Sequence, residues 1–128
     1  MSTQISVTVG NLQGKVHLTG RGHTPHEVQI DYIPPFGEDD GFMSLELLLI
    51  SLASCSGHAV LLLLRKMGMT VNGLEVGATG TRRDEHPTMI TDVELDFRLQ
   101  GEGLDVASVE KAIQLAEETY CPVWAMLK

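Results

Sequence analysis

One apolar stretch, residues 44–67, limits what this chain can fold into more than any other feature. It is too long and too rich in leucine for a β-strand, and Gly68 follows where a helix would end. A helix over these residues would be about 36 Å long at a rise of about 1.5 Å per residue. Because it is apolar on almost every side, we expect it to be buried on almost every side.

The length of this stretch would suffice for a membrane span, but its sequence favours the core helix of a soluble protein. Polar residues interrupt it, and Arg65 and Lys66 close it. The rest of the sequence contains no second hydrophobic segment of this kind. We therefore predict a core helix and no association with a membrane.

Several polar residues of the stretch fall on one side of the predicted helix, which we call the polar seam. At about 100° per residue they lie within roughly 60° of one another, with Arg65 just beside them. The polar seam consists of Ser44, Ser51, Cys55 and His58. A narrow seam with a thiol in its middle faces either a cavity or a second helix that shares it.

Composition and charge narrow the class of protein. A chain of 128 residues with 43% hydrophobic content is long enough for one domain with a real core, so we predict a single domain over residues 1–128. The net charge of −8 argues against nucleic acid as a partner, because phosphate binding needs a surplus of Lys and Arg. The N-terminal residues do not resemble a signal peptide, so we expect a cytoplasmic protein, in which two cysteines are more often reduced or catalytic than a structural disulfide.

Alternating apolar and polar residues predict strands on both sides of the long helix. The expected half-buried strands before it cover residues 5–9, 16–19 and 28–32, with turns beginning at Gly10 and Gly20. After it we expect a strand from Val71 toward Arg82 and another over residues 93–99, which Gly101 to Gly103 would break. A second helix, capped by Asp105, would run from Val106 to about Thr119. This order predicts an α+β fold with helices covering one face of antiparallel sheets.

The two cysteines are the main candidates for chemistry. Cys55 lies in the polar seam, whereas Cys121 follows the second helix and precedes Pro122, in a segment expected to move. Buried free cysteine is also a common core residue, so simple core filling stays an alternative for Cys55. A thiolate in apolar surroundings needs a nearby cation. The candidate cations are Arg21, His58, Arg65, Arg82 and Arg83.

Other interpretations of these residues are weaker. Metal ligation by Cys55, His58 and Cys121 lacks the paired-cysteine spacing of a strong metal signal. A thioredoxin-like motif is excluded because the cysteine of that motif lies at the start of a helix, whereas Cys55 lies in the middle of the predicted helix. His58 is most simply a seam histidine that hydrogen-bonds a partner chain. Glu46 faces away from Cys55 on a straight helix, about 13 Å along it, so the two cooperate only through a kink, an intermediary or a second subunit.

Two motifs together resemble the OsmC/Ohr family of osmotically inducible and organic-hydroperoxide-resistance proteins. The first runs from Ser44-Leu45-Glu46 to Ala53-Ser54-Cys55, and the second is Tyr120-Cys121-Pro122-Val123. The stretch from Val28 to Asp31 before an acidic loop and the order of elements are similar too. Leu45 stands where family peroxidases often carry proline, which suggests the OsmC-like branch.

This resemblance implies an intertwined homodimer and a thiol peroxidase that needs no cofactor or metal. Cys55 would match the peroxidatic cysteine and Cys121 the resolving cysteine, with a hydroperoxide as substrate and an external dithiol as reductant. Glu46 and Arg21 are the positions for the glutamate and arginine that family members pair with the first cysteine.

The leading hypothesis is therefore a two-cysteine peroxidase for organic hydroperoxides in oxidative stress defence. An apolar wall would favour organic over hydrogen peroxide, with contributions from Phe42, Met43, Met67 and Trp124. The alternative is a non-enzymatic dimer that binds a small apolar ligand, with incidental cysteines. In either case we expect a large dimer interface, because so apolar a helix needs more cover than one small chain provides.

Overall fold

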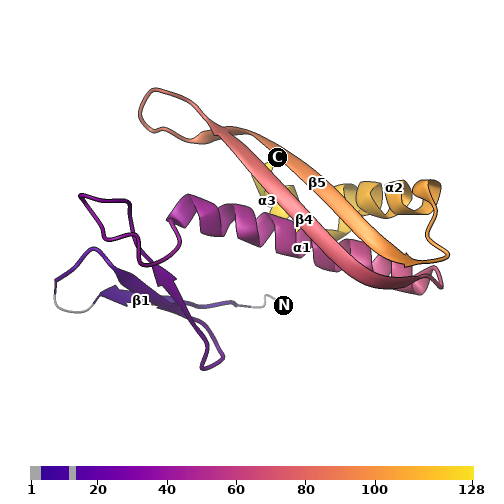
Figure 1. The fold of residues 1–128 in the computed structure, drawn as a ribbon, viewed down its shortest axis with the longest axis horizontal. Coiled ribbons are helices and arrows are strands. Elements are labelled where there is room, and N and C mark those ends of the chain that lie inside the picture. Colours follow the sequence, from indigo (N-terminus) through magenta and orange to yellow (C-terminus); the bar gives the residue numbers. More distant parts are fainter. Residues whose placement is uncertain (1–3, 12–13) are drawn as a thin grey trace. The chain divides into compact units, whose positions relative to one another are not determined.

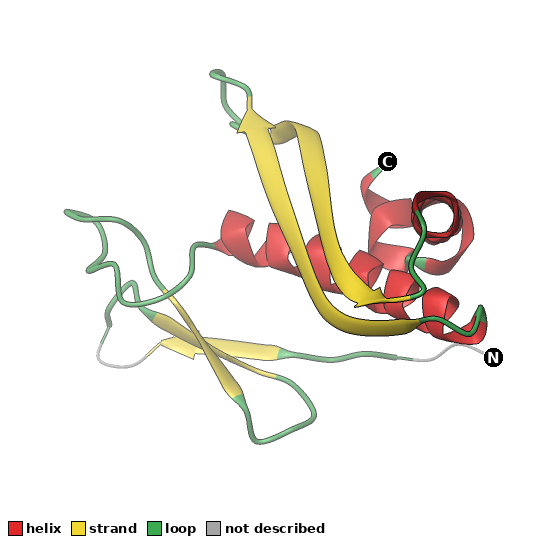
Figure 2. Cartoon of the chain, turned by 45° about the vertical axis from the view of Figure 1, so that its right-hand side comes forward, coloured by secondary structure: helices red, strands yellow, loops and turns green. Residues whose placement is uncertain are grey.

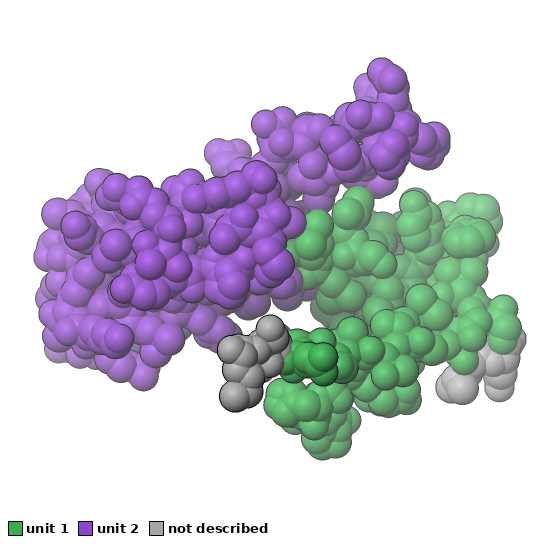
Figure 3. All heavy atoms as spheres, turned by 180° about the vertical axis from the view of Figure 1, so that it is seen from behind, with its two compact units in different colours: residues 1–48 green, residues 49–128 purple. Residues whose placement is uncertain are grey.

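The computed structural model describes residues 4–11 and 14–128 and has the predicted α+β architecture (Figure 1). It divides into two compact units, residues 1–48 and 49–128, coloured separately in Figure 3. The single-domain interpretation stays a prediction, and each unit is described by itself. The elements in chain order are β1 (Thr8–Asn11), β2 (Leu18–Arg21), β3 (Glu27–Ile30), α1 (Ser44–Lys66), β4 (Thr70–Arg82), β5 (Ile90–Glu102), α2 (Val106–Leu115), the π-helix η1 (Ala116–Tyr120) and α3 (Pro122–Leu127).

The N-terminal unit contains a three-stranded antiparallel sheet in the order β1-β2-β3 (Figure 2). The first two strands lie further along the chain than predicted. β1 is an edge strand whose residues are all exposed, so the expectation of a half-buried strand there is wrong. Gly20 lies within β2, not in a turn, because it pairs with Val28 and a Cβ there would come within 3.0 Å of the Val28 side chain.

The loop after β3 is organised by the carboxylate of Asp31, which is only 4% exposed. It accepts hydrogen bonds from the backbone N–H groups of Tyr32 at 2.7 Å, and of Glu38 and Asp40 at 3.1 Å each. The bond from Tyr32 is the largest cause that holds the pKa of Asp31 below its ordinary value, against the opposing effect of burial. The chain then returns alongside β3, where the N–H of Phe42 donates to the carbonyl of Gln29 at 2.9 Å.

Helix α1 begins and ends within one residue of its prediction. At its start the N–H of Met43 donates to the Glu46 carboxylate at 2.8 Å, so Glu46 satisfies one of the donors that a helix leaves unpaired. At its end Gly68 has a φ of +82°, and the N–H of Met69 donates to the carbonyl of Leu64 at 3.0 Å. A left-handed glycine of this kind is the expected helix stop.

The core of the C-terminal unit forms where α1 packs against α2 and one face of the β4–β5 hairpin (Figure 2). Gly57 lets α1 approach β4 closely, since a Cβ there would lie 3.2 Å from the side chain of Leu74. The fully buried members of the core are Val60, Leu64, Ala112 and Ala116. By length and composition alone α1 could cross a membrane. Only 33% of its most apolar window is buried, so the expectation of burial on almost every side is wrong for this chain by itself.

Two predictions for the C-terminal unit need correction. The strand expected to break at Gly101 in fact continues as β5 to Glu102. Gly101 is compatible with the strand because its backbone lies so close to the carbonyl of Thr70 that a side chain would not fit. The second helix is capped by Asp105 as predicted, and the Asp105 carboxylate accepts from the N–H of Ser108 at 2.8 Å. It changes to the π-helix η1 at Ala116, and α3, which the sequence did not predict, follows.

Replacing Gly101 by alanine should lower the free energy of unfolding by about 1–3 kcal/mol, the usual range for overpacking. The new Cβ would lie 2.0 Å from the carbonyl oxygen of Thr70, so the β4–β5 pairing must shift. Gly77→Ala is the matched control in the same hairpin, because its Cβ meets nothing closer than 4.0 Å. Urea unfolding of both variants measures the difference, and equal stabilities would contradict this account of Gly101.

Candidate thiol site

Cys55 lies half-buried on α1, on the side of the helix that carries the polar seam. The neighbouring seam residues Ser51 and His58 are exposed. Large apolar side chains flank them, with Ile50 45% and Leu62 57% exposed. The seam therefore forms the part of α1 that its own unit leaves uncovered.

Cys121 lies in a more enclosed position than the sequence predicted. It is only 2% exposed and forms the N-cap of α3, with Pro122 at the first helical position. The N–H of Trp124 donates to its sulfur at 3.4 Å, and its own N–H donates to the carbonyl of Ala116 at 2.9 Å. The expectation of a mobile segment is therefore wrong, because Pro122 begins a helix here and does not merely end one.

The two cysteines, far apart in the sequence, meet in the C-terminal unit as free thiols. The two lie close enough together for Cys55 to raise the pKa of Cys121. Burial is the main cause that raises the pKa of Cys121, and its hydrogen bond to Cys55 raises that pKa further. The backbone N–H groups of Trp124 and Val123 only partly offset these effects. Cys121 is therefore a protonated thiol at neutral pH.

The structure gives the other two predicted site residues, Glu46 and Arg21, local partners in the N-terminal unit. Glu46 caps the start of α1, as described above. The guanidinium of Arg21 forms an ion pair with Glu27 at 2.5 Å, with both side chains about half exposed. Their role beside Cys55 stays a prediction.

The remaining candidate cations differ in their hydrogen bonds and in their exposure. Arg82 donates to the carbonyl of Thr88 at 2.7 Å, and Arg83 to the carbonyls of Glu85 and His86 at 2.9 and 3.0 Å. Both therefore hold together the end of the β4–β5 hairpin. Arg65 and His58 are exposed on α1, and His58 follows Cys55 by one helical turn. Of the two candidates on α1, His58 lies closer to Cys55 along the helix than Arg65 does.

An apolar cavity of about 360 Å³ lies in the same unit as the two cysteines, although neither cysteine lines it. Leu52 precedes Cys55 by one turn of α1, and Trp124 donates its N–H to Cys121, so two of the lining residues connect the cavity to the cysteines. Of the predicted wall, Trp124 lines this cavity, whereas Met67 does not. Val93, Leu95 and Phe97 of β5 also line the cavity, and the sequence analysis did not predict a role for them there. The lining consists of Leu52, Val93, Leu95, Phe97, Ile113 and Trp124.

A second cavity, of about 430 Å³, lies between α1 and β4. The seam residue His58 lines it together with Ser54 and Gly57, and β4 contributes Leu74 and Val76. This cavity is therefore a hollow on the side of α1 where apolar residues remain exposed.

Comparison with known proteins places the chain among relatives of this architecture. Residues 37–128 match the family model for OsmC-like protein. Protein YhfA of Escherichia coli K12 is 36% identical over 84 residues, which cover 66% of this chain and 63% of YhfA. The match therefore leaves more than a third of YhfA outside it.

Solved structures agree with this chain over nearly its whole length. A hypothetical protein from Aquifex aeolicus superposes with a TM-score of 0.84 at 28% identity, covering 98% of this chain and 88% of that one. An organic hydroperoxide resistance protein from Elizabethkingia anophelis superposes with a TM-score of 0.69 at 15% identity, covering 100% and 90%. At that identity the second similarity shows a shared fold and no more.

Proposed function

The chain belongs to the OsmC-like protein family, and on this premise we propose that it is a cytoplasmic two-cysteine peroxidase that reduces organic hydroperoxides. The observation that carries the proposal is the meeting of Cys55 and Cys121 as free thiols of unequal burial. A peroxidase of this kind needs one thiol that reacts first and a second one close enough to form a disulfide with it.

The difference between the thiols supports the assignment of roles. Cys121 is buried and its pKa is raised, which makes it a poor first nucleophile, since the thiolate is the reactive form. Cys55 is more exposed and lies close to the protonated thiol of Cys121. Cys55 is therefore the peroxidatic cysteine and Cys121 the resolving cysteine.

The reaction proceeds in three steps that balance. The thiolate of Cys55 attacks one oxygen of the hydroperoxide, the O–O bond breaks, and with one proton the products are an alcohol and a Cys55 sulfenic acid. The thiol of Cys121 then displaces water from that sulfenic acid to form the Cys55–Cys121 disulfide. An external dithiol reduces this disulfide and is itself oxidised, which restores both thiols.

The apolar cavity supports an organic hydroperoxide as the substrate. Its walls are hydrocarbon and aromatic, so they favour a substrate with an apolar tail over hydrogen peroxide. The name of the Elizabethkingia anophelis protein, organic hydroperoxide resistance protein, agrees with this choice. The cavity would equally suit the alternative function, reversible binding of a small apolar molecule without chemistry at the cysteines.

A thiol assay distinguishes the two functions. The reduced chain should lose both thiols when it receives one equivalent of cumene hydroperoxide, and dithiothreitol should restore them. The rate should exceed that of the same chain unfolded in urea by about 100-fold or more, the smallest gain typical of positioned proton transfer. Unchanged thiol counts, or equal rates for the folded and unfolded chain, would favour the binding protein.

Single cysteine variants test the roles of the two thiols. Cys55→Ser should abolish hydroperoxide consumption, because a hydroxyl is a far weaker nucleophile at neutral pH. Cys121→Ser should still consume one equivalent and leave a sulfenic acid on Cys55, which dimedone and mass spectrometry detect. The opposite pattern would mean that the roles are reversed.

Charge-neutral variants of Glu46 and Arg21 test whether these residues activate Cys55. Glutamine also serves as a capping residue, so Glu46→Gln keeps the helix start and removes only the charge. If Glu46 acts beside Cys55, the reaction of Cys55 with the hydroperoxide should be at least about tenfold slower in Glu46→Gln. A tenfold loss corresponds to an activation barrier that is higher by about 1.4 kcal/mol. Arg21→Gln should do the same, whereas Glu27→Gln, which breaks the same exposed ion pair, should not. Equal rates for Arg21→Gln and Glu27→Gln would exclude a role for Arg21.

We further propose that the active form is a homodimer joined across the exposed side of α1. Ile50 and Leu62 expose large apolar surfaces there, and a hollow lined by Leu74 and Val76 adjoins them. Exposed apolar surfaces that adjoin in this way mark interaction sites more often than bare solvent-facing surface. A second copy of the same helix side is the simplest complement in a symmetric pair.

Sedimentation at micromolar concentration should give a dimer, and Leu62→Glu should shift the population toward monomer because it buries a charge in the interface. Val106→Glu is the control, since Val106 is even more exposed than Leu62 but lies on α2. A folded monomer for the unmodified chain at this concentration would refute the dimer.

A further inference from the structure

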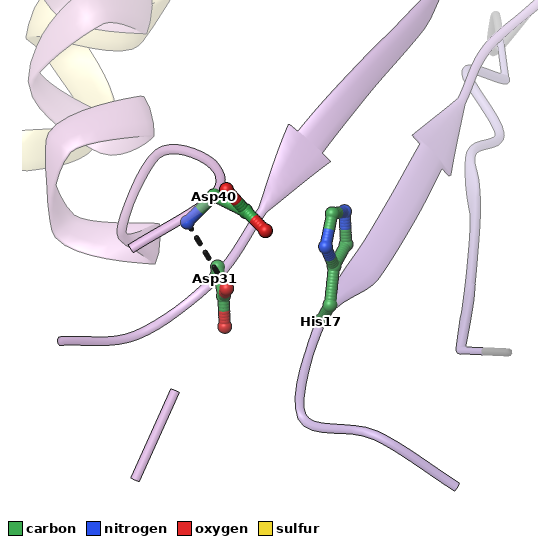
Figure 4. Close-up of side chains that lie close together, drawn as sticks. All are labelled: His17, Asp31 and Asp40. Carbon is green, nitrogen blue, oxygen red and sulfur yellow. Dashed lines mark hydrogen bonds between the residues drawn. The ribbon is translucent and has the colours of Figure 1, made fainter. Parts of the chain in front are cut away.

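Three side chains that commonly ligate metal ions converge in the N-terminal unit, away from either cysteine in the sequence (Figure 4). His17 precedes β2, Asp31 follows β3, and Asp40 lies in the loop that leads to α1. One ligand atom from each lies within 4.8 Å of the other two. We propose that His17, Asp31 and Asp40 bind a divalent transition-metal ion, for which Zn²⁺ is the best match.

The hydrogen bonding of His17 prepares it to be a ligand. Its Nε2 lies 2.6 Å from Oε1 of Gln29, an oxygen that also accepts from the hydroxyl of Thr19 at 3.1 Å. Because an amide oxygen only accepts, Nε2 carries the hydrogen, and in the neutral ring Nδ1 holds a lone pair. Figure 4 shows the other ring nitrogen on the side of the carboxylates. A ligating histidine held from behind in this manner is the usual arrangement in metal sites.

The carboxylate of Asp31 is likewise fixed before any ion binds. Its Oδ2 accepts two backbone N–H groups, from Glu38 and Asp40, whereas Oδ1 accepts only that of Tyr32. Oδ1 therefore retains a lone pair. These three hydrogen bonds hold the buried carboxylate in one orientation. Asp31 is the rigid ligand of the site.

The cluster has negative charge without a cation to balance it. Within residues 4–11 and 14–128, neither Asp31 nor Asp40 forms an ion pair with Lys or Arg, and the nearby Lys15 pairs with Glu38 at 3.7 Å. Two carboxylates and a nitrogen lone pair within 4.8 Å of one another repel unless a cation lies between them. A metal ion or a proton on His17 would supply that charge.

The ligand types favour a metal such as zinc over calcium or magnesium. Zn²⁺ accepts imidazole nitrogen and carboxylate oxygen at about 2.0–2.2 Å, whereas Ca²⁺ and Mg²⁺ prefer oxygen ligands alone. Tetrahedral ligands at that distance lie about 3.3 Å apart, so atoms that now lie up to 4.8 Å apart must approach by as much as about 1.5 Å. Asp40 is exposed and can make this adjustment while water fills the fourth position. The ion would join the loop after β3 to the start of β2.

Calorimetric titration of the full chain with Zn²⁺, after removal of metals by a chelator, tests the site. His17→Gln and Asp40→Asn should each remove one equivalent of binding, or weaken it by at least about tenfold, the smallest loss that even outer-shell changes produce. His26→Gln and Asp39→Asn are matched controls, because both residues are exposed in the same unit and lie outside the cluster. All four variants keep both cysteines, so any zinc on the thiols cancels in the comparison.

Thermal unfolding provides a second measurement. Zn²⁺ should raise the unfolding temperature of the unmodified chain and of the two controls, but not of His17→Gln or Asp40→Asn. If Asp40→Asn binds zinc as the controls do, or if the unmodified chain binds none, the proposal is wrong. Should His17→Gln fail to fold, Asp40→Asn decides alone, since its side chain is exposed.

Discussion

The requirement to cover the long apolar helix α1 governs the rest of the C-terminal unit. α2 and one face of the β4–β5 hairpin bury part of its circumference, with Val60 and Leu64 fully enclosed. Gly57 allows the hairpin to approach closely enough for this contact. The polar seam remains on the side that this packing leaves open. One helix therefore supplies both the core of its unit and the surface on which Cys55 lies.

Unequal burial is what gives two chemically identical side chains different properties. Burial holds the proton on Cys121, whereas the half-exposed Cys55 is open to a reagent from outside. A pair of equally exposed thiols would have no built-in order of reaction. Here the order follows from the position of each cysteine, one within a long helix and the other enclosed where a π-helix meets a short α-helix.

The sequence predicted those features that depend on local pattern. The apolar run and Gly68 defined α1, and Asp105 defined the start of α2, because periodicity and capping act within a few residues. Cys121 was misjudged because Pro122 was interpreted only as a helix terminator, although proline also fits the first turn of a new helix. The proximity of the two thiols depends on elements that lie far apart in the chain, and so does the apolar cavity. Their formation is a matter of tertiary packing, which no local pattern encodes.

The π-helix before Cys121 affects the direction in which the side chain of this cysteine points. In η1 the N–H of Cys121 bonds to the carbonyl of Ala116, five residues back, where an α-helix would bond four residues back. The wider turn accommodates one residue more than an α-helical turn would, which is equivalent to a rotation of about 100° for everything that follows. Continued as an ordinary α-helix, the same chain would point its sulfur in another direction. A single extra residue thus acts as an angular adjustment that sets the direction of a thiol.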